Sequence, residues 1–305
     1  MSAGLVPLML VPAVPAAAQS AQSSQMLPSR VGVTRVTLAP DRPVQGTLFQ
    51  VFVKPGVKPD TLDARDVVAI RGSCAGEPLH FEERGGGVWW ALAAVPITAR
   101  GDLRMPIVLE DGGPADTLWA TVRVRKGDFH MERLRVAPRF GRPPGAALRR
   151  RMADESARAH RVSRESHDVP RLWQAPFRLP RNSRVTGGFG DGREFNGRIE
   201  SRHMGVDLRG AQGAPVRAMA NGYVALVDRF YLGGNVVYID HGAGLVSAYL
   251  HLSRTLVQEG QAVSAGEVIG RVGATGRVTG PHLHWIVRYG QITVSGLSLP
   301  GLLRH

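Results

Sequence analysis

The residues best suited to chemistry are two histidines near the C-terminus. They lie in the run Thr279-Gly280-Pro281-His282-Leu283-His284-Trp285-Ile286-Val287. The run favours a β-strand, and side chains alternate between the faces of a strand, so His282 and His284 are expected on the same face. Pro281 cannot donate a ladder hydrogen bond and is expected at the start of the strand. Two imidazoles so placed could hold a divalent metal, or place a metal ligand beside a general acid or base; ordinary surface or core histidines are the alternative.

A second histidine is followed four residues later by an aspartate, in His203-Met204-Gly205-Val206-Asp207. On a helix this spacing would put both side chains on one face, but Gly205 and the β-branched Val206 disfavour a helix. The pair is therefore expected to bracket a loop that enters a strand. One imidazole and one carboxylate from this segment, with one imidazole from the C-terminal pair, would form a three-ligand set of the kind that catalytic zinc sites use. Taken alone, Asp207 could also be a turn or salt-bridge residue.

Another histidine, His251, ends the apolar run Tyr249-Leu250-His251-Leu252 and either is a satisfied strand end or lines a cleft. Gly270, Gly273 and Gly276 follow shortly before the C-terminal pair, and glycines there permit tight turns and an open groove beside the strand. No glutamate stands in a His-Glu-x-x-His arrangement, so a glutamate base of that type is not available.

The elements around these residues are expected to be short strands. From Trp173 onward glycine is very frequent, and the pattern predicts an all-β unit with tight turns. The expected strands are Ala214 to Met219, Gly222 to Asp228, Asn235 to His241, Leu245 to Leu250, Val268 to Val272, His282 to Arg288 and Gln291 to Val294.

The N-terminal half predicts a different β unit. Between residues 31 and 126, about seven short strands separated by Gly, Pro and Asp turns indicate an Ig-like β-sandwich. The Trp89-Trp90 pair could form a carbohydrate platform, although at least one ring is expected in the core. Residues 127–172 are expected to be a linker containing a helix from Gly145 to His160, and residues from about Gln19 to Arg30 a flexible exit from a leader.

The net charge, the cysteine count and the N-terminal segment limit the classes of function that the protein can have. The formal net charge is +13, mostly from scattered arginine, and no nucleic-acid recognition pattern is visible, so nucleic-acid binding is not expected. The single cysteine, Cys74, excludes an internal disulfide and a cysteine-type zinc site. Residues 1–18 are expected to be a signal peptide, with an apolar stretch too short to span a bilayer and an Ala-rich cleavage site, although no Lys or Arg precedes it. The mature protein is then exported and has no stable membrane span.

The C-terminal part resembles the lysostaphin-type murein metallopeptidases, which are zinc endopeptidases that cut peptide cross-bridges in bacterial peptidoglycan. The resemblance covers roughly Phe177 to Val294. It rests on Gly187-Gly188-Phe189-Gly190, Phe195-Asn196-Gly197, His203-x-Gly205-x-Asp207, Gly213-Ala214-Pro215-Val216, Ala220-Asn221-Gly222, Gly234-Asn235, Asp240-His241-Gly242, Tyr249-Leu250-His251-Leu252, Gly260-Gln261, Gly270, Gly273, Thr275-Gly276 and Thr279-Gly280-Pro281-His282-Leu283-His284, in that order.

The resemblance implies roles for five residues. It implies that His203, Asp207 and His284 bind one zinc ion and that His251 and His282 flank the metal-bound water as catalytic residues. It also implies an antiparallel β-groove fold for residues 173–305. The N-terminal sandwich is similar to the accessory domain that precedes some of these peptidases in Gram-negative bacteria. One departure is Val294-Ser295-Gly296, which stands where an Asp-Pro pair is common.

Two functions are compatible with these features. The first is a periplasmic or cell-envelope zinc metalloprotease, a hydrolase of peptidoglycan peptide stems and cross-bridges that remodels the cell wall at a D-alanyl–diaminopimelate or a glycyl bond. The second is a catalytically silent module of the same shape that binds the wall or activates another hydrolase. Silent modules usually lack one or more ligands, whereas all five expected positions are filled here. The sequence therefore favours the enzyme.

Overall fold

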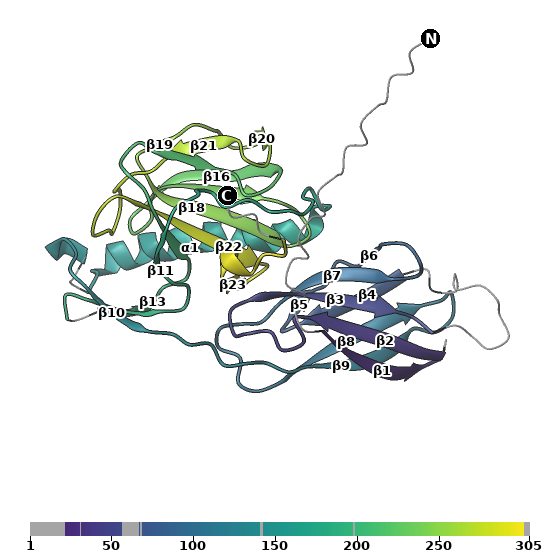
Figure 1. Cartoon of the computed structure of the whole chain (residues 1–305). Coiled ribbons are helices and arrows are strands. Elements are labelled where there is room, and N and C mark those ends of the chain that lie inside the picture. Colours follow the sequence, from purple (N-terminus) through teal and green to yellow (C-terminus); the bar gives the residue numbers. More distant parts are fainter. Residues whose placement is uncertain are drawn as a thin grey trace, which may run out of the picture.

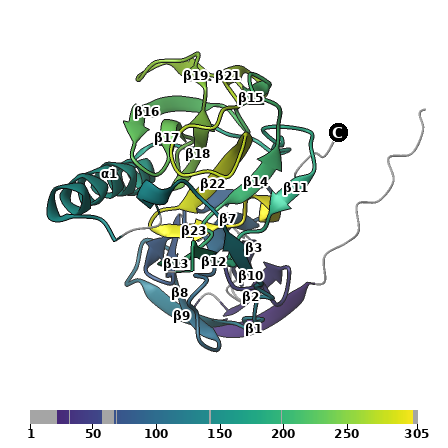
Figure 2. The ribbon, with the colours of Figure 1, turned by 90° about the vertical axis from the view of Figure 1, so that its left-hand side faces the viewer.

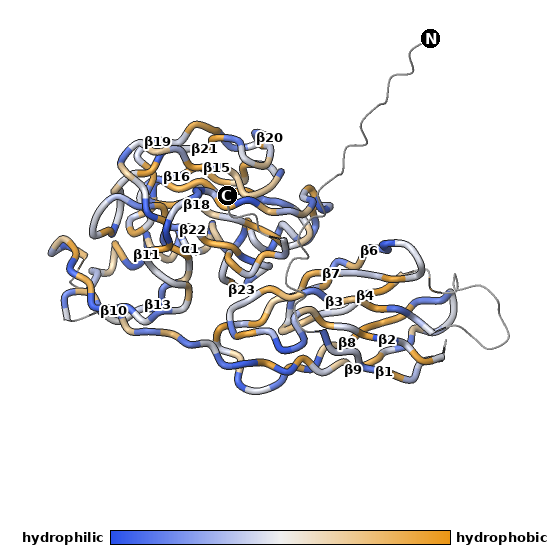
Figure 3. The backbone as a smooth tube through the Cα atoms, viewed as in Figure 1, coloured by the Kyte–Doolittle hydropathy of each residue, from blue (hydrophilic) through white to orange (hydrophobic). Residues whose placement is uncertain are grey.

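The protein consists of two β-rich units joined by a segment that contains the long helix (Figure 1). The computed structural model describes residues 22–30, 32–56, 67, 69–140, 143–197 and 199–301, so the expected signal peptide lies outside the described residues. Hydrophobic and hydrophilic segments alternate along the chain in both units (Figure 3). The architecture confirms the predicted all-β fold class.

The N-terminal unit is a sandwich of two sheets. One sheet has the order β1-β2-β3-β7-β6 and the other the order β5-β4-β8-β9. Their strands are β1 (Ser23–Ser29), β2 (Gly32–Ala39), β3 (Leu48–Lys54), β4 (Ala69–Cys74), β5 (Glu77–Pro78), β6 (Glu82–Glu83), β7 (Trp89–Ala94), β8 (Leu103–Glu110) and β9 (Asp116–Val122). Alternate residues of the two inner faces form one core, which includes Val51, Ala91 and Ile107.

Strand β1 corrects one expectation. The Ser/Gln-rich segment before Arg30 is not a flexible exit, because residues 23–29 pair with β2 in antiparallel register. The side chain of Gln25 exchanges two hydrogen bonds with the backbone of Thr121, each of 2.8 Å, and so ties the two sheets together. Leu27 also packs against the sandwich core. These partners are distant in the chain, so local composition does not reveal them.

The C-terminal unit is built around one large antiparallel sheet with the order β11-β14-β22-β18-β17-β16-β20, with β23 paired to β22. Its strands are β11 (Val185–Gly187), β14 (Val206–Arg209), β16 (Gly222–Phe230), β17 (Gly234–Asp240), β18 (Leu245–Leu252), β20 (Ala262–Val263), β22 (His282–Tyr289) and β23 (Ile292–Val294). Two three-stranded sheets flank it, one of β15 (Pro215–Arg217), β21 (Val268–Arg271) and β19 (Arg254–Thr255), the other of β10 (Met131–Leu134), β12 (Gly192–Phe195) and β13 (Ile199–Arg202).

Helix α1 (Ala146–Glu165) covers one face of this sheet (Figure 2). Its Ala159 and Val162 pack on Phe230, Tyr238 and other residues of the central strands. The helix extends five residues beyond the predicted end at His160. It carries many arginines, and no helix in the described part of the chain is long and apolar enough to cross a membrane. Short 3₁₀ turns lie at Pro138–Phe140, Ser166–Asp168 and Gly296–Ser298.

Strand β22 explains why a cavity can exist on this sheet. Leu283, Trp285 and Val287 point into the core of the C-terminal unit and are fully buried. On the opposite face, Ile286 packs against the cluster beneath α1, whereas His282 and His284 lie nearer the start of the strand. The helix therefore covers one end of this face and leaves the histidine end to other elements.

The two units share part of their cores. Leu48 and Trp90 of the sandwich belong to the same buried cluster as Trp173 and Trp285. Trp90 is 1% exposed and meets Trp173 edge-on at 5.8 Å, while Trp89 packs on the sandwich core. Burial of this kind removes Trp90 as a carbohydrate platform. The tail residue Ser295 is tied to the sandwich as well, since its backbone nitrogen donates to the Gly46 carbonyl.

Polar side chains also meet at this junction. His167, which follows α1, lies between Glu77 and His80 of the sandwich, with ring nitrogens 2.9 Å from the Glu77 carboxylate and 2.8 Å from the His80 ring. Burial, followed by the charges of His167 and Arg171, lowers the pKa of His80 to about 4. No motif in the sequence links His80 or His167 to other residues. In the structure both rings form hydrogen bonds at the junction between the two units.

We expect His241 to make stability depend on pH. Its buried ring meets the Asn221 carbonyl and the Ser247 hydroxyl at 2.7 Å each, and burial lowers its pKa from 6.5 to about 4. Between these values the unfolded chain binds a proton that the folded chain does not. Its stabilising contribution is therefore complete above pH 6.5 and is lost as the pH falls towards the folded value, by up to about 3 kcal/mol. In urea unfolding, the stability gap between wild type and His241→Gln should shrink at acidic pH; a constant gap contradicts this account.

Candidate functional site

Two neighbouring strands place the central pair of side chains. Strands β14 and β22 are antiparallel, and Asp207 is directly opposite His284. His203 lies between β13 and β14, so the segment from His203 to Asp207 is a loop that enters a strand, as the sequence predicts. Gly205 is required at this turn, because a Cβ there would lie 2.7 Å from the His284 ring and 2.8 Å from the Trp285 carbonyl oxygen.

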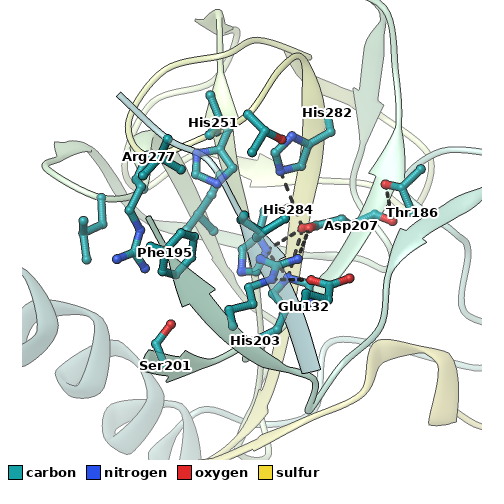
Figure 4. Close-up of a pocket in the computed structure, with 18 of the residues that line it drawn as sticks. Glu132, Thr186, Phe195, Ser201, His203, Asp207, His251, Arg277, His282 and His284 are labelled. Carbon is teal, nitrogen blue, oxygen red and sulfur yellow. Dashed lines mark hydrogen bonds and ion pairs between the residues drawn. The ribbon is translucent and has the colours of Figure 1, made fainter. Parts of the chain in front are cut away.

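The three residues converge on one point (Figure 4). Asp207 Oδ1 lies 3.1 Å from His203 Nε2 and 2.8 Å from His284 Nδ1, and the two ring nitrogens are 2.9 Å apart. All three side chains are buried. His203 Nδ1 faces the Gly188 carbonyl, which can only accept, so that nitrogen carries the proton and Nε2 keeps its lone pair for the site.

Electrostatic interactions keep Asp207 and His284 in the protonation states that can bind a metal ion. Burial acts to raise the pKa of Asp207, but the close contacts with His203 and His284 outweigh it and hold this pKa well below its usual range. Burial lowers the pKa of His284 to about 4, against the opposing effect of Asp207. The carboxylate is therefore charged and the His284 imidazole neutral at pH 7, which are the protonation states that metal binding requires.

The donor set fits a divalent metal ion. One nitrogen from each of His203 and His284 and one oxygen from Asp207 lie within 4.8 Å of one another. Two imidazoles and a carboxylate are a common protein donor set at catalytic metal sites, where a fourth position stays open. Among the described residues, this is the one group of His, Cys, Asp and Glu that meets such a spacing.

Two further histidines face the same cavity. The His251 ring lies 5.1 Å from that of His282 and 5.7 Å from that of His284. His251 follows the last residue of β18 that pairs with β22, and its positive φ of 63° marks a sharp change in backbone direction. Such a φ is uncommon for a residue with a side chain and is typical of functional positions.

The tautomers of these two histidines are set by the backbone. His251 Nδ1 is 2.8 Å from the Thr275 carbonyl, and His282 Nδ1 is 2.8 Å from the Gly280 carbonyl. Each Nδ1 must carry a proton in these bonds, so in the neutral form of each ring the lone pair is on Nε2. Burial, followed by the proximity of the titratable His284 and His282 rings, lowers the pKa of His251 well below its usual value. A neutral imidazole with a free Nε2 can accept a proton.

The cavity that collects these groups has a volume of about 470 Å³. All five residues singled out in the sequence line it: His203, Asp207, His251, His282 and His284. The nearby glycines act in two ways. Gly276 has a positive φ of 79°, a conformation that favours glycine. A Cβ on Gly273 would come within 2.6 Å of the His251 carbonyl oxygen, so glycine at this position allows the close approach of the His251 backbone.

Sequence reasoning missed one wall of this cavity. Strand β10, in the segment expected to be a linker, pairs in parallel with β12 and adds Glu132 and Leu134 to the lining. Asn196 fixes this arrangement, since its side-chain amide accepts from the Val136 nitrogen and donates to the Val136 oxygen, both at 3.0 Å.

Arg193 on β12 links the missed wall to the group formed by His203, Asp207 and His284. It donates to Glu132 Oε2 at 2.8 Å and to Asp207 Oδ2 at 2.6 Å. The guanidinium thus holds the second oxygen of Asp207 and leaves the first oxygen facing the two imidazoles. Arg193 precedes Asp207 by 14 residues and lies on a different strand, so no local pattern in the sequence links the two residues.

Replacing Arg193 with glutamine is expected to weaken binding of a divalent metal ion about 10- to 100-fold, with zinc as the ion to be tested, because outer partners orient the ligands of metal sites. Competition with a chromogenic chelator measures this affinity. Arg133→Gln is the control, since Arg133 on β10 is exposed and pairs at the surface with Glu194. Unchanged zinc affinity in Arg193→Gln would show that Asp207 needs no such support.

Comparisons with known proteins agree with this geometry. The model of Peptidase family M23 matches residues 201–295, which include all five cavity residues named above. Peptidoglycan DD-endopeptidase ShyA of Vibrio cholerae is 43% identical over 100 residues, which are 32% of this chain and 23% of ShyA. DD-carboxypeptidase/endopeptidase Mpg of Neisseria meningitidis is 45% identical over 97 residues, which are 32% of this chain and 22% of Mpg. The similarity thus spans less than a quarter of either relative.

Structural similarity extends further along the chain. A crystal structure of a Pseudomonas aeruginosa protein assigned to peptidase M23 aligns with a TM-score of 0.64 and 25% identity, over 85% of this chain and 96% of that one. Since the family model covers only residues 201–295, this coverage includes much of the preceding sequence as well. The resemblance inferred from the motifs is confirmed: the chain carries a lysostaphin-type domain of peptidase family M23.

Proposed function

We propose that the protein is a zinc-dependent endopeptidase that hydrolyses peptide cross-links of bacterial peptidoglycan in the cell envelope. The observation that carries this proposal is the convergence of His203, Asp207 and His284 in a cavity that also holds two histidines whose Nδ1 atoms donate to backbone carbonyls. The names of the relatives ShyA and Mpg support the substrate class.

In the proposed mechanism, His203, Asp207 and His284 hold the zinc ion. When bound, zinc supplies Lewis-acid polarisation of the scissile carbonyl and acidifies a water molecule. His251 Nε2 or His282 Nε2 takes the proton of the attacking water and later delivers a proton to the leaving amine. The same two rings, once protonated, stabilise negative charge that develops on the carbonyl oxygen. Arg193 donates to Asp207 Oδ2 and keeps this carboxylate oriented throughout.

A catalytically silent wall-binding module is the other function that this fold could serve. Such a module needs the groove but neither the ligands nor the two flanking histidines. Here the imidazoles and the carboxylate are held by specific partners, among them the carbonyls of Gly188, Thr275 and Gly280. Burying these polar groups costs desolvation free energy that a passive binding module does not need to spend. Their arrangement therefore favours a catalytic function over passive binding.

Digestion of purified sacculi separates these functions. The zinc-loaded protein is expected to release soluble muropeptides whose masses correspond to cleaved peptide cross-links, with one zinc per chain by metal analysis. The chelator-treated protein is the control, and activity should return when zinc is added back. Sacculi that bind the zinc-loaded protein but release nothing would favour the silent module.

A further inference from the structure

The cavity contains a cation that has no anionic partner. Three arginines line it: Arg193, Arg202 and Arg277. Arg193 is bonded to Glu132 and Asp207, and Arg202 donates to the Gly190 carbonyl at 2.7 Å. Among the residues that the structure describes, no acceptor bonds to the Arg277 guanidinium and no carboxylate pairs with it; its close neighbour is the Phe195 ring, 3.9 Å from Cζ.

The position of Arg277 is fixed rather than incidental. Its backbone nitrogen donates to the Leu232 carbonyl at 2.8 Å. The preceding Gly276 has a positive φ of 79°, and a Cβ there would lie 2.3 Å from the same Leu232 oxygen. The aromatic face of buried Phe195 then supports the guanidinium through a cation–π contact and leaves its N–H groups free to donate.

The electrostatic environment disfavours an unpaired charge at this point. Partial burial and the nearby Arg193 both lower the pKa of Arg277, although a guanidinium remains protonated in proteins. An anion entering the cavity would relieve this repulsion and restore the hydrogen bonds lost to burial. The groove is thus prepared for a negatively charged group of a ligand.

Arg277 also lies on the side of the cavity where proton transfer is proposed. It is two residues from Thr275, whose carbonyl binds His251 Nδ1. Figure 4 shows Arg277 and Phe195 beside His251, with Thr186 beyond Asp207 at the other side. A carboxylate bound to Arg277 would therefore sit next to the bond on which His251 acts.

We propose that Arg277 binds a free carboxylate of the substrate beside the scissile bond, and so selects cross-links made through a diamino acid over glycyl bridges. This inference rests on the proposed endopeptidase function. In a D-alanyl–diaminopimelate cross-link, the carbon that bears the leaving amine also bears a free carboxylate. A glycyl bridge offers no such group. A planar guanidinium binds a carboxylate through two parallel N–H bonds, which fixes the orientation of the substrate as well as its affinity.

The test uses three substrates and the full-length zinc-loaded protein. The first is a muropeptide dimer cross-linked through D-alanyl–diaminopimelate, the second is the same dimer with that carboxylate converted to the amide, and the third is a pentaglycine peptide. Values of kcat and KM are measured for wild type, Arg277→Gln and Arg277→Lys. Arg271→Gln is the matched control, because Arg271 is exposed and does not line the cavity. Zinc content and thermal unfolding of each variant check the metal and the fold.

The expected result is a preference of wild type for the free carboxylate by about 10- to 100-fold in kcat/KM, the range for a charge-assisted hydrogen bond. Arg277→Gln should lose this factor on the first substrate, change little on the amidated one, and so erase the preference. Arg277→Lys should restore part of it, and Arg271→Gln should behave as wild type.

Other outcomes overturn the inference in distinguishable ways. Equal losses on both dimers in Arg277→Gln would mean that Arg277 only supports Phe195 and the loop. Equal cleavage of both dimers by wild type, or cleavage of pentaglycine alone, would refute carboxylate selection and leave the endopeptidase intact. No cleavage of any of the three substrates would refute the proposed function itself.

Discussion

Alanine at position 207 is expected to abolish both zinc binding and peptide cleavage. Asp207 supplies the oxygen that both His203 Nε2 and His284 Nδ1 approach, and it is the anion that Arg193 neutralises. Without it, two imidazoles and an arginine face each other with no negative charge among them. Since loss of an outer partner alone costs metal sites about 10- to 100-fold, loss of this ligand should reduce activity to below about 1% of wild type.

Metal analysis after gel filtration and release of muropeptides from sacculi measure the two losses. Asp228→Ala is the matched control, because Asp228 on β16 pairs with Arg158 of α1 and does not line the cavity. Thermal unfolding in the presence of a chelator tests whether the Asp207→Ala chain still folds. A folded variant that keeps one zinc and cleaves sacculi would exclude Asp207 as a ligand.

A different pattern is expected when His251 is replaced. His251→Ala should retain zinc, since its ring is not among the three converging donors, yet lose about 10²- to 10⁴-fold in kcat, the usual contribution of a general acid or base. The backbone φ of 63° complicates alanine at this position, so His251→Asn is the companion variant, because asparagine tolerates this conformation.

Both variants should show the same loss if the ring itself matters. Metal content is read by mass spectrometry under native conditions, and turnover by muropeptide release. If His251→Asn cleaves muropeptides at the wild-type rate, the role assigned to His251 is wrong. If both variants lose zinc, His251 acts on the metal site rather than on the proton.

The histidines and their strands were readable from the sequence because the relevant patterns are local. The predicted strand from Asn235 to His241 corresponds to β17, and that from His282 to Arg288 to β22. Alternation of apolar side chains and glycine-marked turns define these strands without reference to distant residues. The loop from His203 into a strand followed from Gly205 and Val206 in the same way. The metal and catalytic roles of the five residues stay predictions until the variants are measured.

The missed elements depend on partners far along the chain. Strand β1 is held by β2 and by Thr121, and β10 is held by β12, which lies about sixty residues later. Neither segment has the strong alternation that marks an independent strand. The pairing of Arg193 with Asp207 is also a product of tertiary structure, because nothing in the segment around Arg193 distinguishes it from an ordinary surface charge.

The attachment of β10 to β12 has a practical consequence for anyone who trims this protein to a minimal active fragment. A version that starts at Trp173, where the glycine-rich sequence begins, would lack Glu132 and the backbone of Val136, which hold Arg193 and Asn196. It would also lack α1, which shields Phe230 and Tyr238. A shortened version should therefore begin before Met131 to keep this wall of the cavity, and it also needs the sandwich, because Leu48 and Trp90 share a buried core with Trp173 and Trp285.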